Sequence, residues 1–93
     1  MEHKKWPATI DEAVGVVIAT LSDEDKAAIS AMAESELTGL HLGLGAWIRN
    51  SLGLWSGNRS LLESTGAPNA DDASMVIIEA LWERLREMVP KVH

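Results

Sequence analysis

The last third of the chain carries an apolar stripe that is too wide for a surface helix. Between 72 and 89, apolar residues recur at the three- and four-residue spacing of one helical face. That face is formed by Met75, Ile78, Trp82, Leu85 and Val89, and it is widened by Val76, Ile77, Ala80 and Leu81. A helix with so broad an apolar face has to be covered on several sides by other elements. The pattern therefore predicts that this helix is the most buried one, with the rest of the chain packed around it.

Helix start signals divide the first half of the chain. Thr9 with Glu12 has the spacing of a capping box, in which a hydroxyl and an acidic side chain satisfy free backbone amides. Ser22 with Asp25 repeats the start signal, and acidic residues crowd the turn that follows, where the helix dipole favours them. Both signals have a purely structural interpretation.

Similar signals mark the second half. Asn58 can cap a short helix that Gly66 closes, and Asp71 or Asp72 can cap the last helix, which stops at Pro90. The expected helices lie near 10–21, 23–34, 36–51, 59–64 and 72–89. The glycines within 36–51 each cost about 1 kcal/mol relative to alanine, so that helix has either a close backbone neighbour or a broken start.

These elements define a fold class. No segment has the alternation of a strand, and no internal repeat is present. A chain of 93 residues supports one domain. We therefore expect an all-α, compact bundle of about four to five helices without a sheet, with a single domain at 1–93 and flexible ends at 1–8 and 91–93.

The net charge of −6 is unevenly distributed along the chain. Residues 1–36 carry a balance of −5 and residues 63–93 a balance of −3, whereas residues 37–62 contain no acidic side chain and a balance of +2 from Arg49 and Arg59. Overall acidity argues against nucleic-acid binding, which depends on neutralising phosphates. The positive middle segment is therefore the place to look for a site.

That middle segment is unusually rich in tryptophan, arginine and asparagine. On a helix, Arg49 lies about 200° from Trp47, so the two side chains point to different sides. The candidate binding residues are Arg49, Asn50, Asn58, Arg59, Trp47 and Trp55.

Two interpretations of these six residues remain open. In the structural one, Arg49 pairs with Asp71 or Asp72 and ties the middle helix to the last one, while Asn50 and Asn58 satisfy backbone groups. In the functional one, the arginines and asparagines line a cleft for an anion or a partner's carboxylate, and the two tryptophans form its walls.

The segment from Leu44 to Trp55 resembles the signature of a family of small bacterial domains of unknown function. The family pattern is Leu-Gly-x-Trp-Ile-Arg-Asn, two variable positions, then Gly-Leu-Trp. Two more family elements match, Asp11-Glu12-Ala13-Val14 and Asp71-Asp72-Ala73-Ser74 followed by Val76-Ile77-Ile78, so the resemblance covers nearly the whole chain. The family often has proline directly before the two aspartates, whereas Asn69 and Ala70 intervene here. The resemblance implies a shared fold and a shared set of residues, but no activity.

The sequence offers no catalytic or metal-binding set. There is no cysteine, and no two histidines have the spacing of metal ligands. His41 lies alone between leucines, where a packed or hydrogen-bonded side chain is the usual outcome. We therefore expect no catalytic residue, no metal and no cofactor, and we consider an enzyme unlikely on this sequence.

These observations favour a protein-interaction or regulatory module whose partner is another protein. The alternative is a protein that binds a small anion or a carboxylate ligand through the six candidate residues. We expect no nucleic-acid partner and no membrane, because the longest uncharged apolar stretch, 37–48, is shorter than the roughly 20 residues that span a bilayer. The expected state is a monomer or weak homodimer in the cytoplasm.

Overall fold

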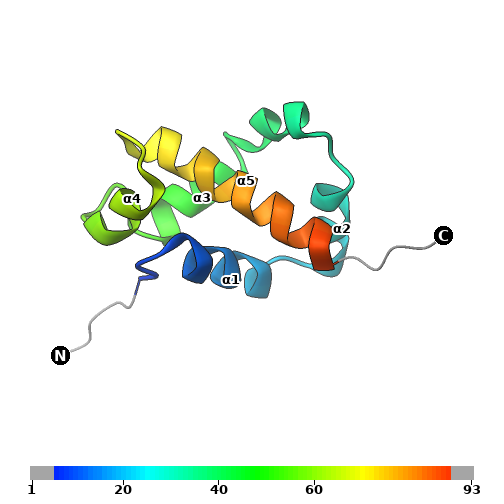
Figure 1. Ribbon diagram of the computed structural model, residues 1–93, viewed down its shortest axis with the longest axis horizontal. Helices are drawn as coiled ribbons and strands as arrows, with labels where there is room; N and C mark the ends of the chain where they lie inside the picture. Colours follow the sequence, from blue (N-terminus) through cyan, green and yellow to red (C-terminus); the bar gives the residue numbers. More distant parts are fainter. Residues whose placement is uncertain (1–5, 89–93) are drawn as a thin grey trace.

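The computed structural model describes residues 6–88, and every regular element among them is a helix (Figure 1). The elements are α1 (Ile10–Thr20), α2 (Asp23–Ser30), the 3-10 helix η1 (Glu34–Leu40), α3 (Leu44–Ser51), α4 (Arg59–Thr65) and α5 (Ala70–Met88). None of these helices is both long enough and apolar enough to cross a bilayer. Residues 1–5 and 89–93 lie outside the described residues, and with them Pro90, part of the predicted flexible end at 1–8 and all of the one at 91–93.

The prediction of four to five helices was wrong, because the described residues form six. The helix expected at 36–51 is divided into η1 and α3, with a turn at 41–43. Gly43 at the break has φ −92° and ψ −84°, outside helical geometry. Two glycines near the junction weaken a continuous α-helix, while the tighter winding of η1 still directs Leu37 into the core.

The helix expected at 23–34 also ends early, at Ser30. The carbonyl oxygen of Met32 accepts a hydrogen bond from the indole Nε1 of Trp82 at 2.9 Å, and the amide of Ala33 donates to the Glu36 carboxylate at 2.7 Å. In a longer helix the amide of Ala33 would donate to the carbonyl oxygen of Ile29, so its bond to Glu36 replaces a helical bond. The Trp82 indole, 50 residues away in the sequence, satisfies the Met32 carbonyl oxygen just after the end of α2.

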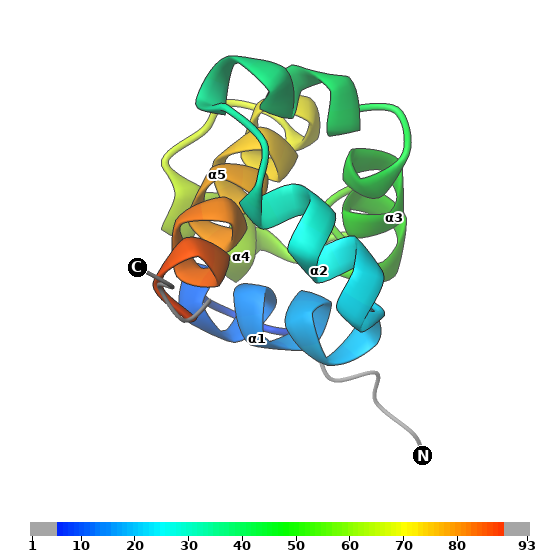
Figure 2. The ribbon, with the colours of Figure 1, turned by 90° about the vertical axis from the view of Figure 1, so that its right-hand side faces the viewer.

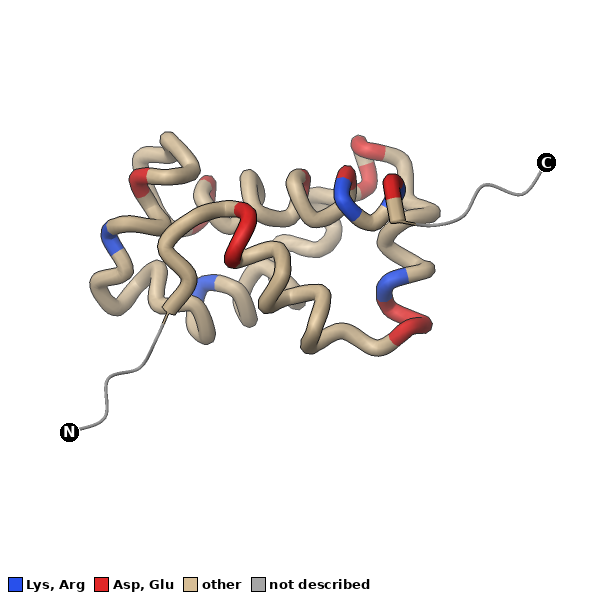
Figure 3. Tube along the Cα trace, turned by 60° about the horizontal axis from the view of Figure 1, so that its bottom comes forward, with Lys and Arg blue, Asp and Glu red and all other residues tan. Residues whose placement is uncertain are grey.

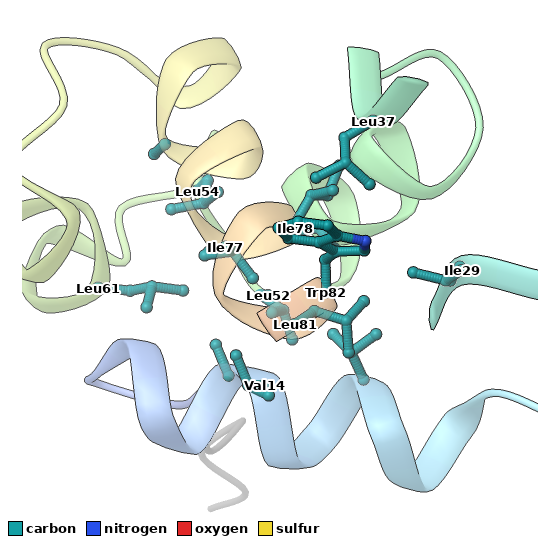
Figure 4. Close-up of a cluster of buried hydrophobic side chains, with 14 of the residues drawn as sticks. Val14, Ile29, Leu37, Leu52, Leu54, Leu61, Ile77, Ile78, Leu81 and Trp82 are labelled. Carbon is teal, nitrogen blue, oxygen red and sulfur yellow. The ribbon is translucent and has the colours of Figure 1, made fainter. Parts of the chain in front are cut away.

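The prediction for the last helix was confirmed. α5 packs against each of the other five helices and has more buried residues than any of them. Its buried side chains include Ile77 and Leu81, which lie toward Leu61 of α4 and Val14 of α1 in Figure 4, and Ile78, which lies toward Leu37 of η1. Figure 2 shows α5 nearly end-on beside α2, with η1 above, α1 below and α3 on the other side of α2. The broad apolar stripe thus places α5 at the centre of the fold.

Three of the predicted caps are present. The hydroxyls of Thr9 and Ser22 accept hydrogen bonds from the third residue of their helices, and the Asn58 side chain does the same at α4. Gly66 ends α4 in the left-handed conformation, with φ +72°. The prediction that Asp71 or Asp72 caps the last helix was wrong, because the Asn69 side chain accepts from the amide of Asp72 at 2.8 Å.

We expect Asn69→Ala to lower the free energy of unfolding by about 1 kcal/mol, the usual effect of losing an N-cap. Asn69→Ser retains an acceptor at the same place and should recover most of that stability. Urea denaturation of the two variants checks the prediction. Equal destabilisation by both would mean that the cap does not account for the effect.

Candidate functional site

Arg49, near the end of α3, is a buried cation, only 4% exposed. Its Nη1 donates to the Ser74 hydroxyl oxygen at 2.9 Å, and its Nη2 donates to the carbonyl oxygen of His41 at 3.2 Å. Its Nε lies 3.4 Å from a carboxylate oxygen of Asp71. The guanidinium therefore joins α3 to the turn after η1 and to the first two turns of α5.

The ion pair at this cluster is open on one side. The Asp71 side chain is 59% exposed, and the Arg49 Nε makes no hydrogen bond of good geometry despite the short distance. Asp72 is exposed and is not the partner. The Trp55 ring lies 5.3 Å from the guanidinium carbon and covers it in a cation–π arrangement. Solvent weakens the charge pairing with Asp71, so the two hydrogen bonds on the buried side hold Arg49 in place.

Two small residues make room for this arrangement. A Cβ at Gly45 would lie 3.0 Å from the Arg49 Nη1, so the glycine one turn earlier lets the guanidinium fold back along α3. Ser74 places a hydroxyl in the buried face of α5, and that hydroxyl also donates to the carbonyl oxygen of Asp71. Sequence reasoning missed Ser74, although a serine within an apolar stripe indicates a buried polar partner.

Asn58 is also buried, at 8% exposed. Its Nδ2 donates to the carbonyl oxygens of Leu52 and Pro7 at 2.7 and 2.9 Å, while its Oδ1 accepts from the amide of Leu61. The side chain thus ties together the end of α3, the start of α4 and the segment before α1. Pro7 belongs to the stretch that the sequence predicted as a flexible end, and the packed part of the chain begins before Thr9.

The remaining candidate residues do not join Arg49 and Asn58 in one cleft. Asn50 and Arg59 are exposed, and Trp55 is more than half exposed. Trp47 points to the other side of α3, as the helical spacing predicts, and lines a separate groove. The six residues therefore occupy buried, exposed and groove-lining positions.

That groove, which we name the Trp47 groove, has a volume of about 490 Å³. It lies between α1, α2 and the η1–α3 segment. Its lining residues are Val17, Thr20, Leu21, Asp25, Ala28, Ile29, Met32, Leu40, Gly43, Leu44 and Trp47. Asp25 is the only acidic or basic residue among them.

The Trp47 groove arises because α2 and α3 both pack on α5 and have little contact with each other. Figure 4 shows Ile29 of α2 standing apart from the other core residues. The structure leaves Ala28 exposed and Met32 half-buried on the groove wall. The small side chains of Ala28 and Gly43 leave space between the two walls. Grooves of this size and apolar character commonly bind ligands or segments of partner proteins.

The described residues contain no group of histidine and acidic side chains that could hold a metal ion. A family model described as "Domain of unknown function (DUF6794)" matches residues 6–85. No curated protein and no solved structure gave a match to the chain.

Proposed function

The chain belongs to the DUF6794 family of domains of unknown function, which brings no activity with it, and we propose that the protein is an interaction module that binds an apolar segment of a partner protein in the Trp47 groove. The observation that carries this proposal is an open groove of about 490 Å³ whose walls are mostly apolar. An open groove of this volume falls within the size range of ligand-binding clefts.

The groove fits the apolar face of a partner helix. On α2, Asp25, Ala28 and Ile29 have the i, i+3, i+4 spacing of one helical face, and Asp25 and Ala28 are exposed where that face lines the groove. Trp47 on the opposite wall supplies an aromatic side chain of the kind enriched at binding hot spots. Apolar side chains of a partner helix, spaced in the same way, can fill such a groove.

The alternative, an anion site built from the six candidate residues, has weaker support. Arg49 and Asn58 are both more than nine-tenths buried, and their polar groups already contact protein atoms. An entering anion would have to displace those contacts.

We expect Ala28→Phe to block the groove and Ala27→Phe to leave it open. Both alanines are exposed residues of α2, but only Ala28 lines the groove, so the two variants match in composition and helix propensity. The probe is a peptide of about 14 residues, four helical turns, with leucines on one face and glutamines elsewhere. Calorimetry measures how tightly the peptide binds. Its dissociation constant should be about tenfold or more higher for the Ala28→Phe variant than for the wild type, and unchanged for the Ala27→Phe variant.

The indole resonances of the four tryptophans locate the bound peptide. Binding in the groove should move the Nε1–H resonance of Trp47 and leave that of Trp55 in place, because Trp55 covers Arg49 and does not line the groove. Equal binding by the two phenylalanine variants, or movement of Trp55 alone, would contradict the proposed site.

A further inference from the structure

We infer that the occupant of the Trp47 groove is a basic amphipathic helix, with lysine or arginine beside its apolar anchors. This inference rests on the proposed function and specifies the partner of the same groove. It follows from the apolar surface that extends beyond the groove and from the charges around it.

The apolar surface continues past the groove at two places. Leu42, 83% exposed, precedes Gly43 on the groove wall, and Val16 on α1 lies one turn before Thr20 on the same helical face. These are two of the four large hydrophobic side chains that are exposed among the described residues. An occupant that also covers them is longer than a small ligand, and a helical segment of a partner protein has that length.

The charges next to the groove are acidic. Asp25 lines it, and the adjacent Glu24 is exposed; neither makes an ion pair within the described residues. Lys26, the nearest basic residue along α2, is held by Asp23 at 3.3 Å. Figure 3 shows this acidic run at the beginning of α2, followed by the single basic position.

The other described basic residues are placed elsewhere. Arg49 is buried beside Asp71, and Arg84 pairs with Asp11 at 2.8 Å. Arg86 lies over the Trp82 ring, and Arg59 is on α4, which does not line the groove. No arginine or lysine of the described chain therefore lines the groove, and its formal charge comes from Asp25.

Charge separates the possible occupants. A second copy of this chain would be repelled, because both copies carry a net charge of −6. A fatty acid would place its carboxylate near Asp25, which has the same charge. A basic helix is attracted by the same groups, and complementary charge raises both specificity and association rate. Among occupants with an apolar face, the basic helix is the one that these side chains favour.

The test uses three peptides that share one leucine face and carry lysine, glutamine or glutamate at the other positions. At low salt, the lysine peptide should bind about tenfold more tightly than the glutamine peptide, and the glutamate peptide should bind most weakly. The preference should fall as salt is added, because these charges are exposed.

A matched pair of variants localises the effect. Asp25→Asn should weaken the lysine peptide roughly two- to fivefold, as for an exposed ion pair, and leave the glutamine peptide unchanged. Glu63→Gln removes the same charge from α4 and should alter neither.

The outcomes separate the two proposals. If the glutamine peptide binds and Ala28→Phe blocks it, but lysine gives no advantage, the basic partner is wrong and the groove remains an interaction site. If no peptide binds, both proposals fail. A dimer in sedimentation that Ala28→Phe dissociates, or binding of lauric acid without any peptide, would also overturn the basic helix.

Discussion

Arg49→Ala is expected to lower the free energy of unfolding by about 3–4 kcal/mol, a large part of the 5–15 kcal/mol typical of a domain. The substitution removes the donors to Ser74 and to the His41 carbonyl and leaves a space where the side chain was buried. The first of these contacts joins α3 to α5, and the second joins α3 to the turn that precedes it. Urea denaturation followed by circular dichroism measures the change.

Variants at Asp71 and Arg49 show whether the ion pair or the hydrogen bonds of Arg49 contribute more to stability. Asp71→Asn should cost less than about 1 kcal/mol, because the carboxylate is 59% exposed and solvent screens its charge. Arg49→Met retains the apolar stem but not the fork, so it should fall between the wild type and Arg49→Ala. If Asp71→Asn lowers the free energy of unfolding as much as Arg49→Ala does, the ion pair, and not the hydrogen bonds to Ser74 and His41, holds Arg49 in place.

The same measurement addresses the anion hypothesis. An arginine kept for a ligand can be removed at little cost to folding, and its loss appears in binding. Unchanged unfolding of Arg49→Ala would therefore contradict the structural role and return the anion site to consideration.

Local sequence patterns predicted the parts of the fold that depend on local chemistry. The apolar stripe of α5 identified the central helix, and the hydroxyls of Thr9 and Ser22 located the starts of α1 and α2. The helix ends that were wrong have two different settings. After α2, the Ala33 amide bonds to the Glu36 side chain, and the Met32 carbonyl oxygen accepts from the Trp82 indole, which is 50 residues away in the sequence. The division between η1 and α3 lies at Gly43, whose backbone is not helical. The apolar periodicity of a single helix predicts neither feature.

The candidate site shows the same division. The spacing of Trp47 and Arg49 separated the two faces of α3 in advance, and Asn58 was recognised as a cap. The Trp47 groove could not be predicted, because apolar residues at helical spacing look alike whether a neighbouring helix covers them or not. Only the tertiary arrangement, in which α2 and α3 both pack on α5, leaves that face of α2 open.

Asn58→Ala is expected to lower the free energy of unfolding by about 2–4 kcal/mol, from a lost cap and two buried carbonyls left without their donor. The sharper prediction concerns Asn58→Asp. Aspartate is as good an N-cap as asparagine, so if Asn58 acted only as a cap, Asn58→Asp would not lower the stability. Here the Nδ2 donates to both Leu52 and Pro7, and aspartate would place a second oxygen against those two carbonyl oxygens.

We therefore expect Asn58→Asp to destabilise the protein at least as much as Asn58→Ala, with thermal and urea unfolding as the measurements. Asn69→Asp supplies the matched control, because Asn69 uses only its oxygen, toward the Asp72 amide, and its exposed side chain tolerates a charge. That control should unfold near the wild-type midpoint. Equal stability of Asn58→Asp and the wild type would reduce Asn58 to a cap. If Asn58→Asp lowers the stability and Asn69→Asp does not, the side-chain amide of Asn58 holds the segment before α1 against the end of α3.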